Sequence, residues 1–494
     1  MDLNLNVEIA RSSLAALRRA ATAEHELPEI EQSEALLRSG ETLLAAGDTS
    51  VREGVAALAT SVATSLEAHE RLLIARAQES IERHRKGNVE IVLADENGNP
   101  LEGARVSYVQ TGRDFLFGAN PLGFSGGFDD DVASLMQTAG INQSHVTVRW
   151  GLLEQAEGEF DWRNMQEFQQ VDAQLAKGMQ LMGALSLWFS PNSDFRPDYL
   201  QAMSFSQLRE ATYRYAYELA HHFAGRIEIW EVNELNLASA NALDLDLESR
   251  IELGRVFAQA VKDANPSARI LNGSTALPFE FADSRPLRDV LRDGAATDII
   301  GLELYYSGVN TAGHAVVGLY LVSLSRTLDH YADFGKPVLV KEFSAPSIQV
   351  DGSSWWHRPW DEQNQADYAT KVYTLAFGNP MVDGISWSWG VSDADAFIHG
   401  GGILDRDFQP KPAYFALRKL LDSWTTRGSA TTDGSGRVAF RGFAGDYTIR
   451  VEPAAGDAFE TTLRLAEGQD LRVAIESPDS IFSVASAKLS HRTR

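Results

Sequence analysis

The sequence contains no cysteine, which excludes disulfide bonds, cysteine-ligated metal sites and thiol nucleophiles. It has no run of about 18 apolar residues, so no membrane-spanning helix is predicted. The N-terminal stretch MDLNLNVEIA does not combine a basic segment with an apolar one, so we expect no secretory signal there. The compartment stays open between the cytoplasm and export followed by removal of a signal.

Positive charge is scarce: 44 Lys and Arg residues stand against 68 Asp and Glu residues, which gives a formal net charge of -24. Nucleic acids and anionic membrane surfaces attract proteins through clustered Lys and Arg side chains, so we expect neither as a partner. A neutral substrate such as a carbohydrate is compatible with this charge, although the charge does not select it.

The chain of 494 residues is longer than one ordinary domain, and its 44% hydrophobic content is ample for a core. Residues 1–87 are rich in Ala, Leu, Glu and Arg, and their apolar residues recur at three- and four-residue spacing. This pattern predicts an N-terminal helical region with breaks at Pro28 and at Gly47-Asp48. We expect this region to pack against the next domain.

Residues 88–112 alternate apolar and polar side chains around an Asn-Gly-Asn-Pro turn, and residues 428–478 alternate in the same way between glycines. The stretches IVLADENGNPLEGARV and TTDGSGRVAF together resemble a carboxypeptidase-regulatory-like or immunoglobulin-like β-sandwich. We therefore predict one sandwich that is split by an inserted domain. The alternative is two unrelated β patches.

Residues 113–427 repeat a strand pattern followed by a helix pattern, which predicts a parallel α/β fold. The expected strands are Phe115–Ala119, Val146–Arg149, Gln180–Leu187, Ile227–Val232, Arg269–Asn272, Asp298–Leu304, Val338–Glu342 and Gly384–Trp389. The expected helices include 165–177, 206–223, 247–263, 317–334, 364–377 and 413–421. Eight such units make a (β/α)8 barrel. A dinucleotide-binding sheet is not expected, because FLFGANPLG lacks the G-x-G-x-x-G spacing.

Two of the expected strands end in carboxylates. The strand within RIEIWEVNELN ends at Asn233-Glu234, and the strand within KPVLVKEFS ends at Glu342. The C-terminal strand ends of a barrel carry its chemistry, and two carboxylates facing each other there suit the hydrolysis of a glycosidic bond. The alternative for this pair is a role as strand-end salt-bridge partners.

The barrel region resembles glycoside hydrolase family 10, a xylanase-like retaining family. The stretches that match in order are RDFLFGAN, RWGLLEQAEGEFDW, IWEVNE, KPVLVKEF, ISWSWG and GGILDRDFQPKPAY. The resemblance implies that Glu342 is the nucleophile, that Glu234 is the acid/base, and that Asn233 binds the 2-hydroxyl of the sugar. It implies no cofactor and no metal.

Aromatic residues gather at the same strand ends. Sugar rings stack their C–H faces on aromatic rings, so we expect several of these residues to bind substrate, the alternative being barrel core. The candidates are Trp150, Trp188, Trp387 and Trp389 at strand ends, and Trp355, Trp356, Trp360 and His357 in the loop after Glu342.

The chain departs from the family pattern next to the expected scissile bond. Ala184 and Phe189 stand where the family has histidines, and Arg149 stands where it has a lysine. These changes imply an altered glycone subsite with Arg149 among its residues. In related families a tyrosine after the sixth strand hydrogen-bonds the nucleophile, which indicates Tyr305 or Tyr306 here. Glu303 is expected to pair with Arg149 or to bind a hydroxyl.

The sequence thus predicts a retaining β-glycoside hydrolase that acts on an oligosaccharide, a polysaccharide or another glycoside. One alternative is a carbohydrate-binding protein with a lapsed active site. A second is a transglycosidase that uses the same residues. The sugar, the linkage, exo or endo action and the oligomeric state are left open.

Overall fold

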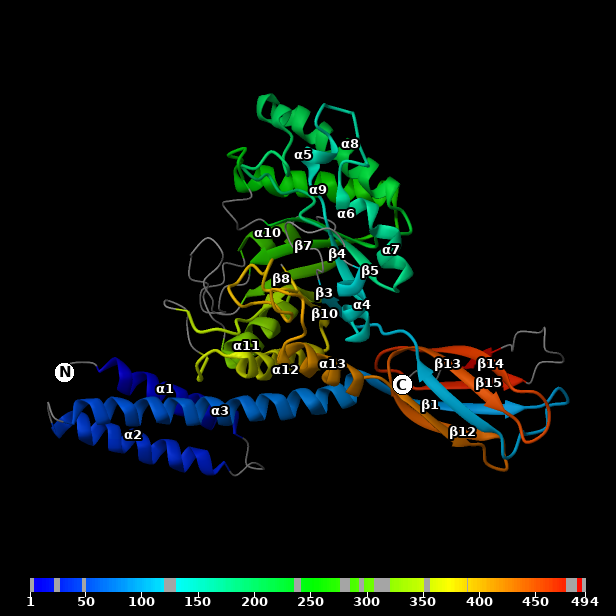
Figure 1. Cartoon of the computed structure of the whole chain (residues 1–494), viewed down its shortest axis with the longest axis horizontal. Helices are drawn as coiled ribbons and strands as arrows, with labels where there is room; N and C mark the ends of the chain where they lie inside the picture. The colour runs from blue at the N-terminus through cyan, green and yellow to red at the C-terminus, as the bar shows by residue number, and fades with distance from the viewer. Residues whose placement is uncertain are drawn as a thin grey trace.

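The computed structural model has three parts, which are N-terminal helices, a parallel barrel and a two-sheet β-sandwich (Figure 1). The long helix α3 runs past the barrel from the other N-terminal helices toward the sandwich. The residues that the structure describes are 4–21, 27–46, 50–119, 130–234, 241–275, 285–292, 297–305, 320–350, 356–388, 390–476 and 487–490. None of the helices in these ranges is long and apolar enough to cross a lipid bilayer.

The N-terminal helices pack side by side, as the helical pattern predicts. They are α1 (Leu5–Ala20), α2 (Pro28–Ala46) and α3 (Val51–His84). The predicted break at Pro28 is confirmed, because a proline suits the first turn of a helix and α2 begins there; Gly47-Asp48 lies outside the described residues. The close approach of α2 to α3 requires Gly40, where a Cβ atom would lie 2.6 Å from Leu58 Cγ.

Eight parallel strands close the barrel in the order β10-β3-β4-β5-β6-β7-β8-β9. The strands are β3 (Leu116–Ala119), β4 (Gln143–Thr147), β5 (Gln180–Ala184), β6 (Ile229–Glu234), β7 (Arg269–Thr275), β8 (Ile299–Tyr305), β9 (Val338–Ser344) and β10 (Val382–Trp387). The helices are α4 (Asp130–Thr138), α5 (Trp150–Leu153), α6 (Gln166–Gln169), α7 (Val171–Ala176), α8 (Phe205–His222), α9 (Leu247–Ala264), α10 (Arg285–Arg292), α11 (Leu321–Ala332), α12 (Glu362–Gly378) and α13 (Pro412–Ser423). The predicted (β/α)8 barrel is confirmed, with strand ends shifted by a few residues.

The β-sandwich is assembled from both sides of the barrel. Its strands are β1 (Lys86–Ala94), β2 (Arg105–Gln110), β11 (Arg427–Thr431), β12 (Arg437–Phe443), β13 (Gly445–Glu452), β14 (Phe459–Leu465), β15 (Leu471–Glu476) and β16 (Ala487–Ser490). The sheet orders are β12-β1-β15-β16 and β11-β2-β13-β14. Alternate residues of β1 (Val89, Ile91 and Leu93) are buried between the sheets, and Ile91 pairs with Val438 of β12. The split sandwich is therefore confirmed.

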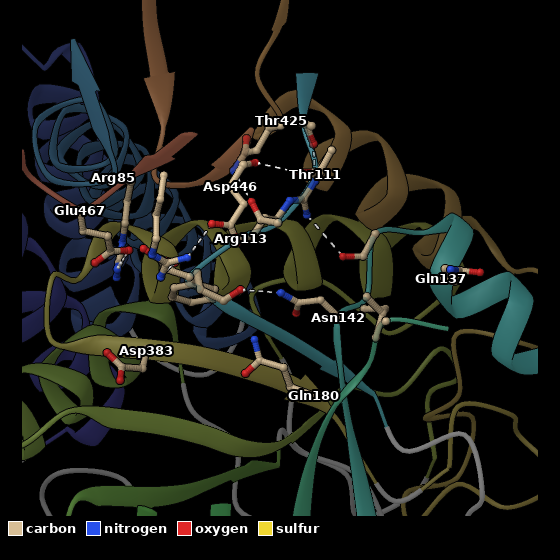
Figure 2. A pocket seen from close by; sticks show the side chains of 18 of the residues that line it. Arg85, Thr111, Arg113, Gln137, Asn142, Gln180, Asp383, Thr425, Asp446 and Glu467 are labelled. Carbon is tan, nitrogen blue, oxygen red and sulfur yellow. Dashed lines mark hydrogen bonds and ion pairs between the residues drawn. The ribbon is translucent and has the colours of Figure 1, made fainter. Parts of the chain in front are cut away.

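A polar cleft of about 880 Å³ lies between the sandwich and the N-terminal strand ends of the barrel (Figure 2). Charged side chains that line it pair with one another, as Arg269 does with Asp383 at 2.9 Å and Arg464 with Asp446 at 3.0 Å. The candidate carboxylates lie at the opposite, C-terminal strand ends. We therefore assign this cleft to the junction between domains and not to the expected chemistry.

Arg85 connects the barrel to the sandwich at this junction. Its guanidinium group is buried and donates to the carbonyls of Phe377, Asn379 and Val382 at 2.6–2.8 Å, and it pairs with Glu467 of the sandwich at 2.7 Å. An Arg85→Met variant leaves these acceptors without their donor, so we expect it to lower the free energy of unfolding by about 2 kcal/mol.

Denaturant unfolding measures this loss against Arg472→Met. Arg472 forms an exposed ion pair with Glu90 in the same sandwich, so its loss is expected to cost below about 1 kcal/mol. Equal effects of the two substitutions would contradict the assigned role of Arg85.

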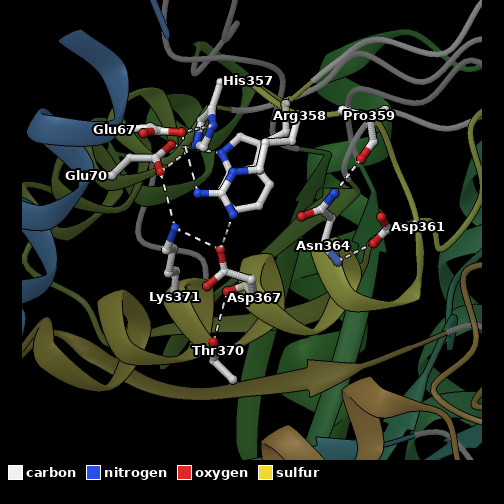
Figure 3. Close-up of polar contacts among 11 residues, drawn as sticks. Glu67, Glu70, His357, Arg358, Pro359, Asp361, Asn364, Asp367, Thr370 and Lys371 are labelled. Carbon is white, nitrogen blue, oxygen red and sulfur yellow. Dashed lines mark hydrogen bonds and ion pairs between the residues drawn. The ribbon is translucent and has the colours of Figure 1, made fainter. Parts of the chain in front are cut away.

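Glu70 of α3 binds the loop that follows β9 (Figure 3). Its buried carboxylate accepts a 2.8 Å hydrogen bond from Trp356 Nε1 and lies 2.8 Å from His357 Nε2. Trp356 is fully buried and Trp360 is 3% exposed. The prediction that Trp356, Trp360 and His357 bind substrate is therefore wrong, because packing against α3 and α12 covers them; Trp355 lies outside the described residues.

Candidate active site

The interior of the barrel holds a buried charge cluster formed by residues of β6, β8 and β9. Lys341 Nζ forms ion pairs with Glu231 at 2.7 Å, with Glu303 at 2.7 Å and with Glu342 at 3.1 Å. All four side chains are at most 7% exposed. Because burial of an unpaired charge costs free energy, the ionised form of each of these groups is stabilised by its oppositely charged partner.

A β-bulge explains how adjacent residues of β9 enter one cluster. Leu302 of β8 pairs with Val340, but Glu303 pairs with Glu342, so Lys341 is the extra residue between them. A regular strand would point Lys341 and Glu342 to opposite faces, whereas a bulge redirects a side chain.

Tyr305, the last residue of β8, donates a hydrogen bond from its hydroxyl to Glu342 Oε2. The predicted contact of a tyrosine with this carboxylate is thus confirmed for Tyr305, and Tyr306 lies outside the described residues. The Tyr305 ring packs in a small apolar cluster with Trp188, Phe195 and Phe397. This cluster places aromatic side chains beside Glu342.

Burial raises the pKa of Glu342 to about 7. The positive charge of Lys341 opposes this rise, the neighbouring carboxylates of Glu303 and Glu231 add to it, and the hydrogen bond from Tyr305 again lowers the pKa. At neutral pH Glu342 therefore exchanges readily between its acid and its ionised form. A group in this state can serve as a nucleophile once it is ionised.

His145 of β4 lies in the same interior and is uncharged at neutral pH. Burial, with a smaller effect from Lys341, lowers its pKa to about 3. Its Nε2 atom has no hydrogen-bond partner among the described residues. Sequence reasoning missed both His145 and Lys341. Lys341 follows the apolar run 338–340, which is a signal for a buried charge, whereas His145 lies among polar residues of β4 and carries no such signal.

Asn233 and Glu234 are the last two residues of β6. The pairing of β6 with β7 shifts register between Glu231 and Glu234, which marks a second bulge at a strand end. Their backbone therefore reaches the same end of the barrel as Glu342, while their side chains lie outside the described part of the chain. Their predicted roles stay predictions.

Two of the predicted sugar-binding tryptophans are part of the core, so those predictions are wrong. Trp150 is 1% exposed; its ring stacks on Tyr215 at 4.0 Å and its Nε1 donates to Glu154 at 2.6 Å. Trp387 is fully buried and donates to the carbonyl of Gly401 at 3.0 Å. Neither ring is open to a sugar, because both side chains are almost completely buried.

The other predicted binding residues differ in their exposure and in their partners. Arg149 is partly exposed and pairs with Glu167 at 2.8 Å, while Glu303 pairs with Lys341, so these ion pairs replace the predicted one between Arg149 and Glu303. Trp188 is half-buried, and its Nε1 has no hydrogen-bond partner among the described residues. Trp389 lies outside the described residues.

No group of three or more potential metal ligands occurs in the described ranges. The side chains that the structure brings together around Glu342 carry carboxylates, an ammonium group and a phenol. Such groups suit proton transfer and nucleophilic attack.

No family model matches the chain. It is 25% identical over 411 residues to the anti-sigma-I factor RsgI6 of Acetivibrio thermocellus, covering 80% of this chain and 49% of that protein. It is 24% identical over 220 residues to endo-1,4-beta-xylanase B of Thermotoga neapolitana, covering 41% of this chain and 58% of that protein.

Among solved structures, xylanase 10B from Thermotoga petrophila RKU-1 in complex with xylobiose matches 63% of this chain and 94% of its own, at 18% identity and a TM-score of 0.49. The native xylanase 10B from Thermotoga maritima gives the same TM-score at 18% identity, covering 63% of this chain and 95% of its own. The chain is thus similar in sequence to a protein named as an anti-sigma-I factor and to a xylanase, and it spans about half the length of the first.

Proposed function

We propose that the protein is a retaining β-glycoside hydrolase with Glu342 as nucleophile and Glu234 as acid/base. The observation that carries the proposal is the ion pair between Lys341 and Glu231, which joins β9 to β6 inside the barrel. Glu342 and Glu234 follow these two residues toward the same end of their strands, as two carboxylates on either side of one glycosidic bond must.

The mechanism has two displacements. The ionised Glu342 attacks the anomeric carbon while Glu234 protonates the leaving oxygen, so the glycosidic bond breaks and an ester to Glu342 forms. Water then attacks the anomeric carbon, Glu234 takes a proton from it, and the ester breaks to restore Glu342. The hydrogen bond from Tyr305 fixes the orientation of the attacking carboxylate.

The substrate class that we propose is a neutral saccharide, xylan-like but bound by an altered glycone subsite. Ala184 and Phe189 stand where the resembling family has histidines, and both are buried, at 2% and 3% exposure. An apolar, buried pair cannot replace the hydrogen bonds that two histidines offer a sugar. Trp188, beside Tyr305, is the candidate stacking surface.

A second candidate function is a carbohydrate sensor without turnover. It is favoured by the curated relative named as an anti-sigma-I factor, a regulator by that name, whose match covers 80% of this chain and therefore extends beyond the barrel. A transglycosidase is a third candidate and differs from the hydrolase only in its acceptor.

The test of the proposed function is hydrolysis of a panel of aryl β-glycosides carrying xylose, xylobiose, glucose, cellobiose, galactose or arabinose. We expect cleavage of at least one glycoside. The Glu234→Ala variant should lose activity on a glycoside with a poor leaving group, which needs protonation by Glu234. Binding on a glycan array without cleavage would replace the hydrolase by the sensor. Transfer of the sugar to an added alcohol in place of water would identify a transglycosidase.

Removal of the Tyr305 hydroxyl should slow the reaction. Tyr305→Phe loses a hydrogen bond to a charged group, so we expect kcat/KM to fall by about 10- to 100-fold. The acid limb of the pH profile should also move to higher pH, because this hydrogen bond lowers the pKa of Glu342. Tyr213→Phe, which removes an exposed hydroxyl bonded to Asp263, is the control and should change neither quantity.

A further inference from the structure

Lys341 is a buried cation that the two-carboxylate mechanism does not use. Its side chain is fully buried, although burial strongly favours the neutral form of an isolated lysine. Carboxylates from β6, β8 and β9 lie within 3.1 Å of its Nζ atom and keep it charged. The ion pairs with these carboxylates therefore stabilise the buried lysine.

The position of the Lys341 ammonium group is fixed from several strands. Glu303 of β8 accepts its 2.7 Å hydrogen bond, and Glu231 of β6 lies at 2.7 Å. Glu231 is itself anchored, because its second oxygen accepts a 2.9 Å hydrogen bond from the backbone of Leu185 after β5. The bulge in β9 supplies the extra residue that lets Lys341 reach this position beside Glu342.

Glu342 receives one donor on each carboxylate oxygen. Lys341 binds Oε1 at 3.1 Å, and the Tyr305 hydroxyl binds Oε2. Two donors on the two oxygens define the plane of the carboxylate, which sets the direction from which it can attack. They also favour its ionised form.

The charge balance makes the lysine necessary. The four groups carry one positive and three potential negative charges, with neutral His145 as a further neighbour. Without Lys341, Glu342 would have to ionise beside Glu231 and Glu303 without the ammonium group that lies 3.1 Å from its Oε1 atom. We propose that Lys341 is a positioning residue for the proposed glycosidase, which holds Glu342 ionised and oriented for attack. This inference rests on the proposed function.

The first test needs no substrate. Unfolding free energies of wild type, Lys341→Met, Glu342→Gln and the double variant form a double-mutant cycle, which is measured at pH 5 and at pH 9. We expect the coupling between Lys341 and Glu342 to be larger at pH 9, where Glu342 is ionised. A coupling that is the same at both pH values would show a merely structural contact and overturn the inference.

The second test is the pH profile of kcat/KM on the aryl glycoside that the panel identifies. Lys341→Met should move the acid limb up by at least about one pH unit, and Lys341→Arg, which keeps the charge, should move it less. Lys411→Met is the matched control, since it breaks the buried Lys411–Asp393 pair of 3.1 Å but leaves the cluster intact. An unmoved limb in an active Lys341→Met enzyme overturns the inference and leaves the proposed function standing.

Glu303→Gln keeps the inference testable if Lys341→Met does not fold. It removes a negative neighbour of Glu342 and frees Lys341 from one competing carboxylate, so the acid limb should move to lower pH. A shift to higher pH, or no shift, would contradict the proposed charge balance. If the panel finds no substrate, only the proposed function is contradicted. The double-mutant cycle at pH 5 and pH 9 then still tests whether Lys341 stabilises the ionised form of Glu342.

Discussion

Replacement of Glu342 by alanine is expected to lower kcat/KM by at least about 10⁴-fold, because the variant lacks the carboxylate that forms the glycosyl ester. Added azide should restore turnover, since the small anion fits the space left by the carboxylate and attacks the anomeric carbon directly. The rescued product should be a glycosyl azide of inverted configuration, because only one displacement then occurs. Product NMR measures this outcome.

Glu228→Ala is the control for this prediction. Glu228 is exposed and lies just before β6, at the end of the barrel opposite Glu342, so its loss should leave kcat/KM unchanged. A Glu342→Ala variant that retains more than about 1% of the activity would remove Glu342 from the nucleophile role.

The second large effect concerns stability. Folding raises the pKa of Glu342 from the ordinary 4.5 to about 7, so between these values the folded protein binds more protons than the unfolded chain. Stability therefore falls as pH rises through this window, by up to about 3 kcal/mol for a shift of this size. Glu342→Gln removes the ionisable group, so the variant should be more stable than wild type at pH 8.

Thermal unfolding of both proteins between pH 4 and pH 9 measures this difference. The advantage of Glu342→Gln should be small below pH 4.5, where both side chains are neutral, and should grow up to about pH 8. Glu467→Gln serves as the comparison, because Glu467 is partly exposed at the domain junction and no similar growth is expected. A constant difference across the range would contradict a raised pKa for Glu342.

A stability difference that grows with pH would mean that ionisation of Glu342 in this site lowers the stability of the folded protein. Three carboxylates around one lysine are destabilising when ionised, and polar or apolar replacements often stabilise such buried clusters. The fold tolerates this cost because the rest of the barrel core is apolar and closely packed, as in β9, where the other residues are buried and largely apolar.

Much of the fold could be predicted because periodicity reports burial. Continuous apolar runs gave the parallel strands, and the alternation at both ends of the barrel gave the split sandwich. The β1 strand shows why this works: its buried residues Val89, Ile91 and Leu93 recur at a period of two. Such patterns are local and need no knowledge of tertiary contacts.

The parts of the site that were missed depend on tertiary structure. Lys341 and Glu342 are adjacent, so alternation predicts opposite faces, and only the bulge opposite Leu302 and Glu303 brings them together. Trp150 and Trp356 follow strands as sugar-binding residues do, but both are buried: Trp150 stacks on Tyr215, and Trp356 donates a hydrogen bond to Glu70. Sequence position places a residue near a strand end and does not report which neighbour covers its ring.

The central claim, that Glu342 is the nucleophile of a retaining glycosidase, is tested most directly by trapping the intermediate. The protein is incubated with activated 2-deoxy-2-fluoro glycosides of the sugars in the panel, and its peptides are mapped by mass spectrometry. The account predicts a single glycosyl adduct on the peptide that contains Glu342. An adduct on Glu303 or another residue, or turnover that releases a sugar of inverted configuration, would contradict it.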